Sequence, residues 1–144
     1  MSTESGDFLL VRAGTRSVGL RLQDVVEVSE LGEVFPVPSH APAIRGVTPA
    51  RGRLVPLLHL GAFLGSGSCP PERASTAVLA EFEGHRVCLE VDEADVLTRE
   101  TMLPVPPDQS LPWARAMVQR TDGFIPILNL SALRARIAEP ENRS

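Results

Sequence analysis

The sequence predicts an all-β protein built from two copies of one strand pattern that pack on a shared interior. Three segments of the first half return in the second half at nearly one spacing, with hydrophobic residues and prolines in the same places. The matching segments are residues 54–60 and 124–130 at an offset of 70, residues 18–22 and 87–91 at an offset of 69, and residues 35–38 and 103–106 at an offset of 68. Self-similarity at a fixed spacing is the signature of a repeated structural unit. A chain of 144 residues with 43% hydrophobic content can bury the core of one ordinary domain, so we expect the two copies to lean on each other.

Each copy is expected to begin with a β-hairpin. In the first copy an apolar run at residues 8–11 is followed by a turn at Gly14 and Thr15, after which apolar and other residues alternate over 18–22. Alternation with a period of two places the apolar set on one face of a strand. In the second copy the corresponding strands and turn fall at residues 78–80, 87–91 and 83–85.

The middle of the first copy is expected to contain a turn and a third strand at residues 23–28, because its three valines fit a pleated sheet better than a helix. Four prolines exclude a long helix over residues 36–50, so we expect extended loop there with a short turn at 43–45. Pro56 and Pro126 lie inside strong strand patterns and cannot donate a ladder hydrogen bond. They therefore predict edge positions or bulges.

Residues 65–71 join the two copies and have the glycine, serine and proline content of a flexible connector. One short C-terminal helix is predicted from apolar residues at helical spacing after candidate N-caps. These apolar residues are Leu130, Leu133 and Ile137, and the candidate caps are Asn129 and Ser131. Residues 1–7 and 139–144 are expected to be flexible tails.

Charge and composition favour a cytoplasmic protein that neither binds nucleic acid nor inserts in a membrane. The formal net charge is −4, and the fourteen basic residues, all arginine, form no run of the kind that phosphate backbones require. The N-terminal stretch is polar, and no apolar run approaches the roughly 20 residues that span a bilayer. Cys69 and Cys88 have neither a CxxC spacing nor zinc partners, so both are interpreted as free thiols.

No catalytic, metal or cofactor site is predicted, and the protein is not expected to be an enzyme. His40, His59 and His85 have no spacing suited to a metal or a nucleophile relay, and no serine lies in a G-x-S-x-G elbow. Acidic residues do cluster near position 92, where a solvated strand face is a better interpretation than a paired-carboxylate site. They are Glu90, Asp92, Glu93 and Asp95.

One pair of charged residues stands out near the repeated segment at residues 54–60. Glu27 lies in an apolar strand pattern, and Arg51 precedes Gly52, which can supply a turn conformation closed to other residues. A Glu27–Arg51 ion pair could fix this turn, since the arginine fork gives defined geometry. Two unrelated surface charges remain the alternative.

Several motifs, in order, resemble the CheW-like coupling proteins of bacterial chemosensory arrays. They are residues 8–11 with 19–22, then 25–28, 42–58, 87–92 and 122–130, and the likeness covers about residues 8–138. The resemblance implies two SH3-like five-stranded β-barrels packed on a shared core. The first barrel-forming half would span about 8–66 and the second about 74–138, with exchange of strands between the barrels left open.

The resemblance also implies a non-enzymatic adaptor without cofactors. Its partners would be the cytoplasmic tips of methyl-accepting chemoreceptors and the regulatory domain of a CheA-type histidine kinase. The predicted partner-binding residues, carried over by position, are Val25, Glu27, Arg45, Gly46, Arg51 and Gly52. His59 departs from the family pattern, which commonly has an acidic residue there.

Three alternatives remain open at the level of sequence. A divergent scaffold could bind one of these partners or another protein. An SH3-like peptide-binding module would need an aromatic-lined groove, yet the chain has no tyrosine. A small enzyme or ligand-binding barrel would need a pocket with convergent polar groups.

Overall fold

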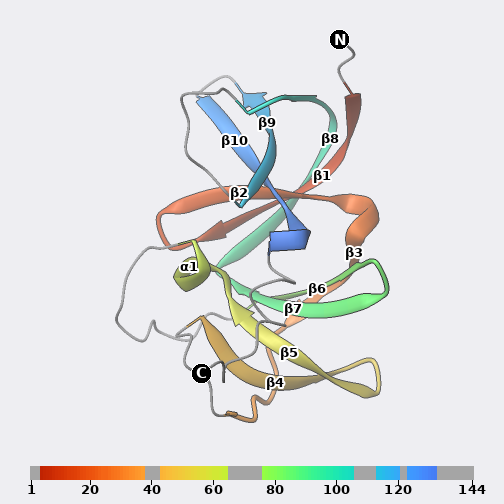
Figure 1. The fold of residues 1–144 in the computed structure, drawn as a ribbon, viewed down its shortest axis with the longest axis vertical. Helices are drawn as coiled ribbons and strands as arrows, with labels where there is room; N and C mark the ends of the chain where they lie inside the picture. Colours follow the sequence, from red (N-terminus) through yellow and green to blue (C-terminus); the bar gives the residue numbers. More distant parts are fainter. Residues whose placement is uncertain (1–3, 38–42, 65–75, 106–112, 121–122, 133–144) are drawn as a thin grey trace, which may run out of the picture.

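A computed structural model describes residues 4–37, 43–64, 76–105, 113–120 and 123–132. Within these residues ten strands form two five-stranded sheets. One is a closed barrel of β1 (Glu4–Ala13), β2 (Arg16–Arg21), β10 (Gly123–Leu128), β9 (Ala114–Arg120) and β8 (Glu93–Leu103), in that order. The other contains β3 (Val25–Glu30), β6 (Thr76–Phe82), β7 (His85–Val91), β5 (Arg53–His59) and β4 (Ile44–Ala50). Figure 1 shows the closed barrel above the second sheet.

The two copies of the repeat exchange strands. The closed barrel combines the β1–β2 hairpin of the first copy with β8, β9 and β10 of the second, and the other sheet combines β6 and β7 with β3, β4 and β5. The exchange is reciprocal, because β5 meets β7 in parallel at Leu57 and Cys88, while β10 meets β2 in parallel at Ile127 and Gly19. Residues 8–66 and 74–138 therefore do not each form one sheet.

Pro56 and Pro126 lie in strands with a neighbour on both sides, so of the two predicted settings, an edge or a bulge, the edge is wrong. A register shift does follow each proline, opposite Leu57 and Leu58 in one strand and between Ile127 and Leu128 in the other. Each proline faces an antiparallel partner, Val47 and Met117 respectively. The parallel contact of each strand begins one residue later, at Leu57 and Ile127. The missing N–H therefore falls just before the neighbouring strand arrives, where no ladder bond is required.

Strand β4 occupies residues that were expected to be loop. Its pairing with β5 runs from Ile44 opposite Leu58 to Ala50 opposite Arg53, with a register shift between Ile44 and Gly46 where the short turn was expected. Because β4 is the last strand in the order of its sheet, Pro49 near its end is tolerated. Residues 38–42 of this stretch lie outside the described residues.

A backbone bridge joins the edge strand β4 to the segment that follows β3 in the chain. Phe35 and Val47 exchange N–H···O bonds of 2.8 and 2.9 Å. Gly46 permits this approach, because a Cβ at this position would come within 2.2 Å of the Phe35 carbonyl oxygen and its φ is +145°. The bridge corresponds in the repeat to the pair of Leu103 and Met117, which closes the other barrel between β8 and β9.

The main core lies between the two sheets, as predicted from the sequence, in which both copies of the repeat share one interior. Residues from both sheets are buried there, including Val11 and Leu20 on one side and Val78 and Leu89 on the other. Each sheet also encloses a smaller core. The core of the second sheet contains Val55, Leu57, Ala77, Leu79 and Cys88, and that of the closed barrel contains Phe8, Ala116, Val118 and Ile127.

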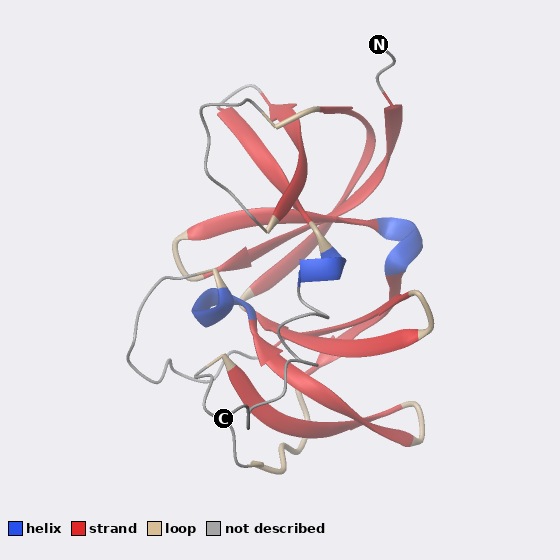
Figure 2. Cartoon of the chain, viewed as in Figure 1, coloured by secondary structure: helices blue, strands red, loops and turns tan. Residues whose placement is uncertain are grey.

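The ends of the described chain differ in part from expectation. Strand β1 already begins at Glu4, so residues 4–7 belong to a sheet and not to a flexible tail. A helical turn begins at Leu130, and the Asn129 side chain accepts a hydrogen bond from the Ser131 N–H at 3.0 Å. It is drawn in blue in Figure 2, and the rest of the predicted helix and residues 139–144 lie outside the described residues.

Two further short helices lie in the described chain, the 3-10 turn η1 (Leu22–Asp24) and α1 (Leu60–Phe63). No helix in the described segments is of a length and apolarity that would let it cross a bilayer.

Candidate partner-binding site

The predicted Glu27–Arg51 pair is formed on the surface of the second sheet. Arg51 Nε donates to Glu27 Oε1 at 2.7 Å, which ties β3 to the turn between β4 and β5. The two side chains remain 53% and 40% exposed. An ion pair this open to water contributes at most about 1 kcal/mol to stability. Its charges therefore remain accessible to a partner.

The turn that carries Arg51 has a strained backbone. Ala50 pairs with Arg53, so Arg51 and Gly52 form a two-residue loop, with φ of +54° and +79°. Two consecutive positive φ angles are what a type I′ hairpin needs. Gly52 adopts them freely, whereas a residue with a Cβ in this region costs roughly 1–2 kcal/mol. The conformation aims the Arg51 side chain across the gap to β3.

A small cavity of about 140 Å³ opens between β3 and β4 beside this pair. Its mouth is lined by Glu27 and Arg51, and its floor reaches Leu79 and Cys88 inside the second sheet. Burial, followed by the charges of Glu90 and Glu27, raises the pKa of the Cys88 thiol to about 11. Cys88 is thus a buried free thiol that stays protonated at neutral pH, and Cys69 lies outside the described residues.

Val25 opens strand β3 directly after η1. It lies opposite Ala80, and the register shifts between Val25 and Glu27. The side chain is partly buried against the main core, so only part of it faces solvent. Val25 and Glu27 therefore present an apolar and a charged contact at one end of the same edge strand.

Arg45 and Glu90 form a second ion pair that sequence reasoning missed. Arg45 Nε and Nη2 donate to the two carboxylate oxygens of Glu90 at 2.9 and 3.1 Å. Glu90 is only 1% exposed and Arg45 24%, so the expectation that Glu90 belongs to a solvated acidic face is wrong. By alternation Glu90 shares a strand face with Cys88 but also with Arg86, so the local pattern alone does not mark that face as buried.

The other acidic residues of this cluster serve local structure. The Asp92 carboxylate accepts a hydrogen bond from the Gly14 N–H at 2.8 Å, and Glu93 pairs with Arg12 at 2.8 Å. Asp95 lies exposed on β8. None of these carboxylates joins another in an acid–base arrangement.

His59 caps helix α1. Its Nδ1 accepts a hydrogen bond from the Ala62 N–H at 3.1 Å, and its side chain is buried. Asn129 is its counterpart in the repeat and caps the C-terminal helical turn, although its side chain accepts from the N–H two residues on, at Ser131, and not three. His85 is exposed and His40 lies outside the described residues. Among the described residues no group of three or more histidine, cysteine or acidic side chains could hold a metal ion.

These observations define a class of protein in which two β-barrels that exchange strands display exposed charged pairs and surface cavities. The chain belongs to the CheW-like domain family, whose model matches residues 7–137. Its fold is similar to the crystal structure of the scaffolding protein TtCheW from Thermoanaerobacter tengcongensis, with a TM-score of 0.75 and 22% sequence identity. That match covers 88% of this chain and 86% of the other. A comparison with curated protein sequences gave no match. The predicted family and the fold of two SH3-like barrels are thus confirmed.

Proposed function

We propose that this protein is a non-enzymatic adaptor of bacterial chemotaxis, which couples the cytoplasmic tips of chemoreceptors to the regulatory domain of a CheA-type histidine kinase. It would act in the cytoplasm and reach the membrane only through receptors. Membership of the CheW-like family supports this proposal, as does the scaffolding protein of similar fold. The single observation that carries it is the exposed Glu27–Arg51 pair on a strained hairpin turn.

The six predicted partner-binding residues divide into two groups. Val25, Glu27 and Arg51 present side chains at the surface, and Gly52 permits the turn that directs Arg51. Arg45 is held by the buried Glu90, and Gly46 is itself buried under the backbone of Phe35. We assign contact with the receptor to the first group. Arg45 and Gly46 would support it by fixing β4.

The proposed contact combines an apolar anchor with a charged pair that fixes register. A helical partner presents side chains at i, i+3 and i+4, which suits a short surface where Val25 lies near Glu27 and Arg51. Because the backbone at this surface is held by β-pairing, binding would order few groups. A smaller ordering cost leaves more of the contact energy as affinity.

A bridging assay tests the adaptor function. A receptor signalling fragment immobilised on beads should retain the kinase regulatory domain only when this protein is added. Capture of one partner without the other would instead identify a divergent scaffold with a single partner. Capture of neither partner would contradict the proposal.

The receptor surface is tested in the same assay with Val25→Lys. This substitution should lower retention on receptor beads and leave binding to the kinase domain in solution unchanged. Arg115→Ala is the matched control, since it alters an exposed residue on β9 of the other barrel. Equal retention of the two variants would reject this surface.

A further inference from the structure

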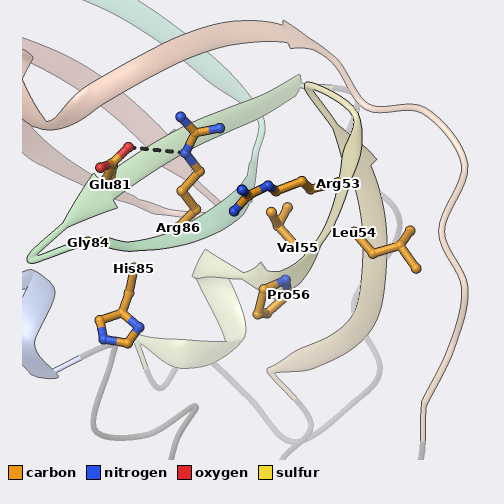
Figure 3. A pocket seen from close by; sticks show the side chains of 8 residues that line it. All are labelled: Arg53, Leu54, Val55, Pro56, Glu81, Gly84, His85 and Arg86. Carbon is orange, nitrogen blue, oxygen red and sulfur yellow. Dashed lines mark hydrogen bonds and ion pairs between the residues drawn. The ribbon is translucent and has the colours of Figure 1, made fainter.

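A second charged site lies beside the β4–β5 hairpin, on the side of β5 and β7 and away from the Glu27–Arg51 pair. Strands β5 and β7 pair only from Leu57 and Cys88 onward. Before that point they diverge and leave a surface notch of about 420 Å³. Its lining includes Arg53, Val55, Pro56, Glu81, His85 and Arg86 (Figure 3). The notch follows from the sequence, because Pro56 has no N–H with which to continue the parallel ladder.

The notch carries more positive than negative charge. Arg86 Nε donates to Glu81 Oε1 at 3.0 Å, so one arginine is balanced by one carboxylate. Arg53 is exposed and makes no ion pair within the described part of the chain. In Figure 3 its guanidinium group reaches toward the stem of Arg86, while His85 points away from both arginines. One positive charge is therefore left over, on a protein of net charge −4.

The internal repeat shows that a barrel of this kind does not require these arginines. By the repeat offsets, Gly123 takes the place of Arg53 in the closed barrel, and Ser17 takes the place of Arg86. Arg12, the counterpart of Glu81, is held by Glu93. The equivalent strands of the closed barrel pair without two arginines at these positions. Arg53 and Arg86 are therefore not needed for strand pairing and are available for binding.

We propose that this notch binds the carboxylate of an aspartate or glutamate side chain on a protein partner. The guanidinium fork matches a carboxylate in two parallel hydrogen bonds. A single unbalanced positive charge suits a monoanion better than a doubly charged phosphate. The partly exposed Pro56 lines the notch together with the arginines and offers apolar contact to the residues that flank the acidic one.

The site is tested first on the isolated protein by NMR. The probes are the capped tripeptides Ac-Leu-Glu-Leu-NH₂ and Ac-Leu-Gln-Leu-NH₂ and inorganic phosphate. The glutamate peptide should shift the side-chain Nε–Hε signals of Arg53 and Arg86, and the glutamine peptide should not. Arg53→Gln should abolish the shift of the Arg86 signal, and Arg115→Gln should retain it. Absence of a shift, or a phosphate response equal to that of the glutamate peptide, would overturn the proposal.

The identity of the partner rests on the proposed function, so a second test uses the complexes. Arg53→Glu should weaken binding to the receptor fragment or the kinase regulatory domain by about tenfold, with the loss concentrated at low salt. Replacing the responsible acidic residue of that partner by arginine should restore binding to Arg53→Glu. Unchanged affinity for both partners would contradict the site. If the wild-type chain binds neither partner, the adaptor function fails, and the peptide titration alone decides on the notch.

Discussion

Two arginine–glutamate pairs lie on the second sheet and differ mainly in burial. Arg45 and Glu90 are joined by two hydrogen bonds with the carboxylate 1% exposed, whereas Arg51 and Glu27 are joined by one bond with both side chains open to water. The same chemistry has different consequences at the two sites. A buried carboxylate that loses its partner is strongly destabilising, while an exposed pair contributes little to folding. The buried pair therefore serves the fold, and we propose that the exposed pair serves recognition of a partner.

The largest expected effect is on the buried pair. Arg45→Ala leaves the Glu90 carboxylate in the interior without the two hydrogen bonds that it accepts from this guanidinium group. We expect a loss of about 3–5 kcal/mol in the free energy of unfolding. Urea denaturation followed by circular dichroism measures it. A loss below about 1 kcal/mol would place this pair in the same class as exposed ones.

The next effect concerns the glycine beside Arg45. Gly46→Ala places a Cβ within 2.2 Å of the Phe35 oxygen at a φ of +145°, so the bridge that closes the second sheet must shift. Strain and overpacking together should cost about 2–4 kcal/mol. Gly123→Ala is the matched control, because its φ is +141° and no atom lies within 4 Å of the added Cβ. Equal losses for the two variants would show that backbone strain alone is responsible.

A pH effect links the two pairs through Cys88. Its pKa is raised to about 11 by burial, then by Glu90, then by Glu27. Below pH 9 the thiol is protonated whether the chain is folded or unfolded. Between pH 9 and 11 it ionises only in the unfolded chain, so stability should fall as the pH rises, by about 2–3 kcal/mol in total.

The composition of the chain allows the ionisation of the Cys88 thiol to be followed with little interference from other groups. The chain has no tyrosine or lysine, so few other groups titrate between pH 9 and 11. Denaturation curves of Cys88→Ala should lack the fall, and those of Cys69→Ser should keep it. Glu90→Gln should lower the thiol pKa more than Glu27→Gln does. The reverse order would contradict the burial assigned to the two pairs.

The smallest expected effect on stability is at the exposed pair. Arg51→Ala breaks one solvent-exposed hydrogen bond to Glu27, and we expect a loss under about 1 kcal/mol. Thermal unfolding monitored by circular dichroism should show a small shift compared with that of Arg45→Ala. A loss as large as that of Arg45→Ala would show that the turn at Arg51 is required for the fold.

The sequence alone was enough to predict the hairpin at the start of each copy, the repeat and the shared core, because alternation and self-similarity record which faces are buried. It also predicted the Glu27–Arg51 pair, since Gly52 marks the turn. It missed strand β4, because the prolines of residues 36–50 indicate extended loop. A proline near the end of an edge strand, such as Pro49, removes no ladder hydrogen bond and does not interrupt the strand. Local pattern could not decide the exchange of strands, which depends on the pairing of Leu57 on β5 with Cys88 on β7, far away in the sequence. The burial of Glu90 escaped notice because its neighbours on the sheet are distant in sequence.

In our proposal the Arg45–Glu90 pair stabilises the fold while the Glu27–Arg51 pair binds the receptor. The decisive test is the affinity of Arg51→Ala for a receptor signalling fragment, measured by isothermal titration calorimetry on protein whose free energy of unfolding is known. The account predicts a loss of about tenfold or more in affinity while the free energy of unfolding changes by less than about 1 kcal/mol. An affinity equal to that of the wild-type chain would contradict it.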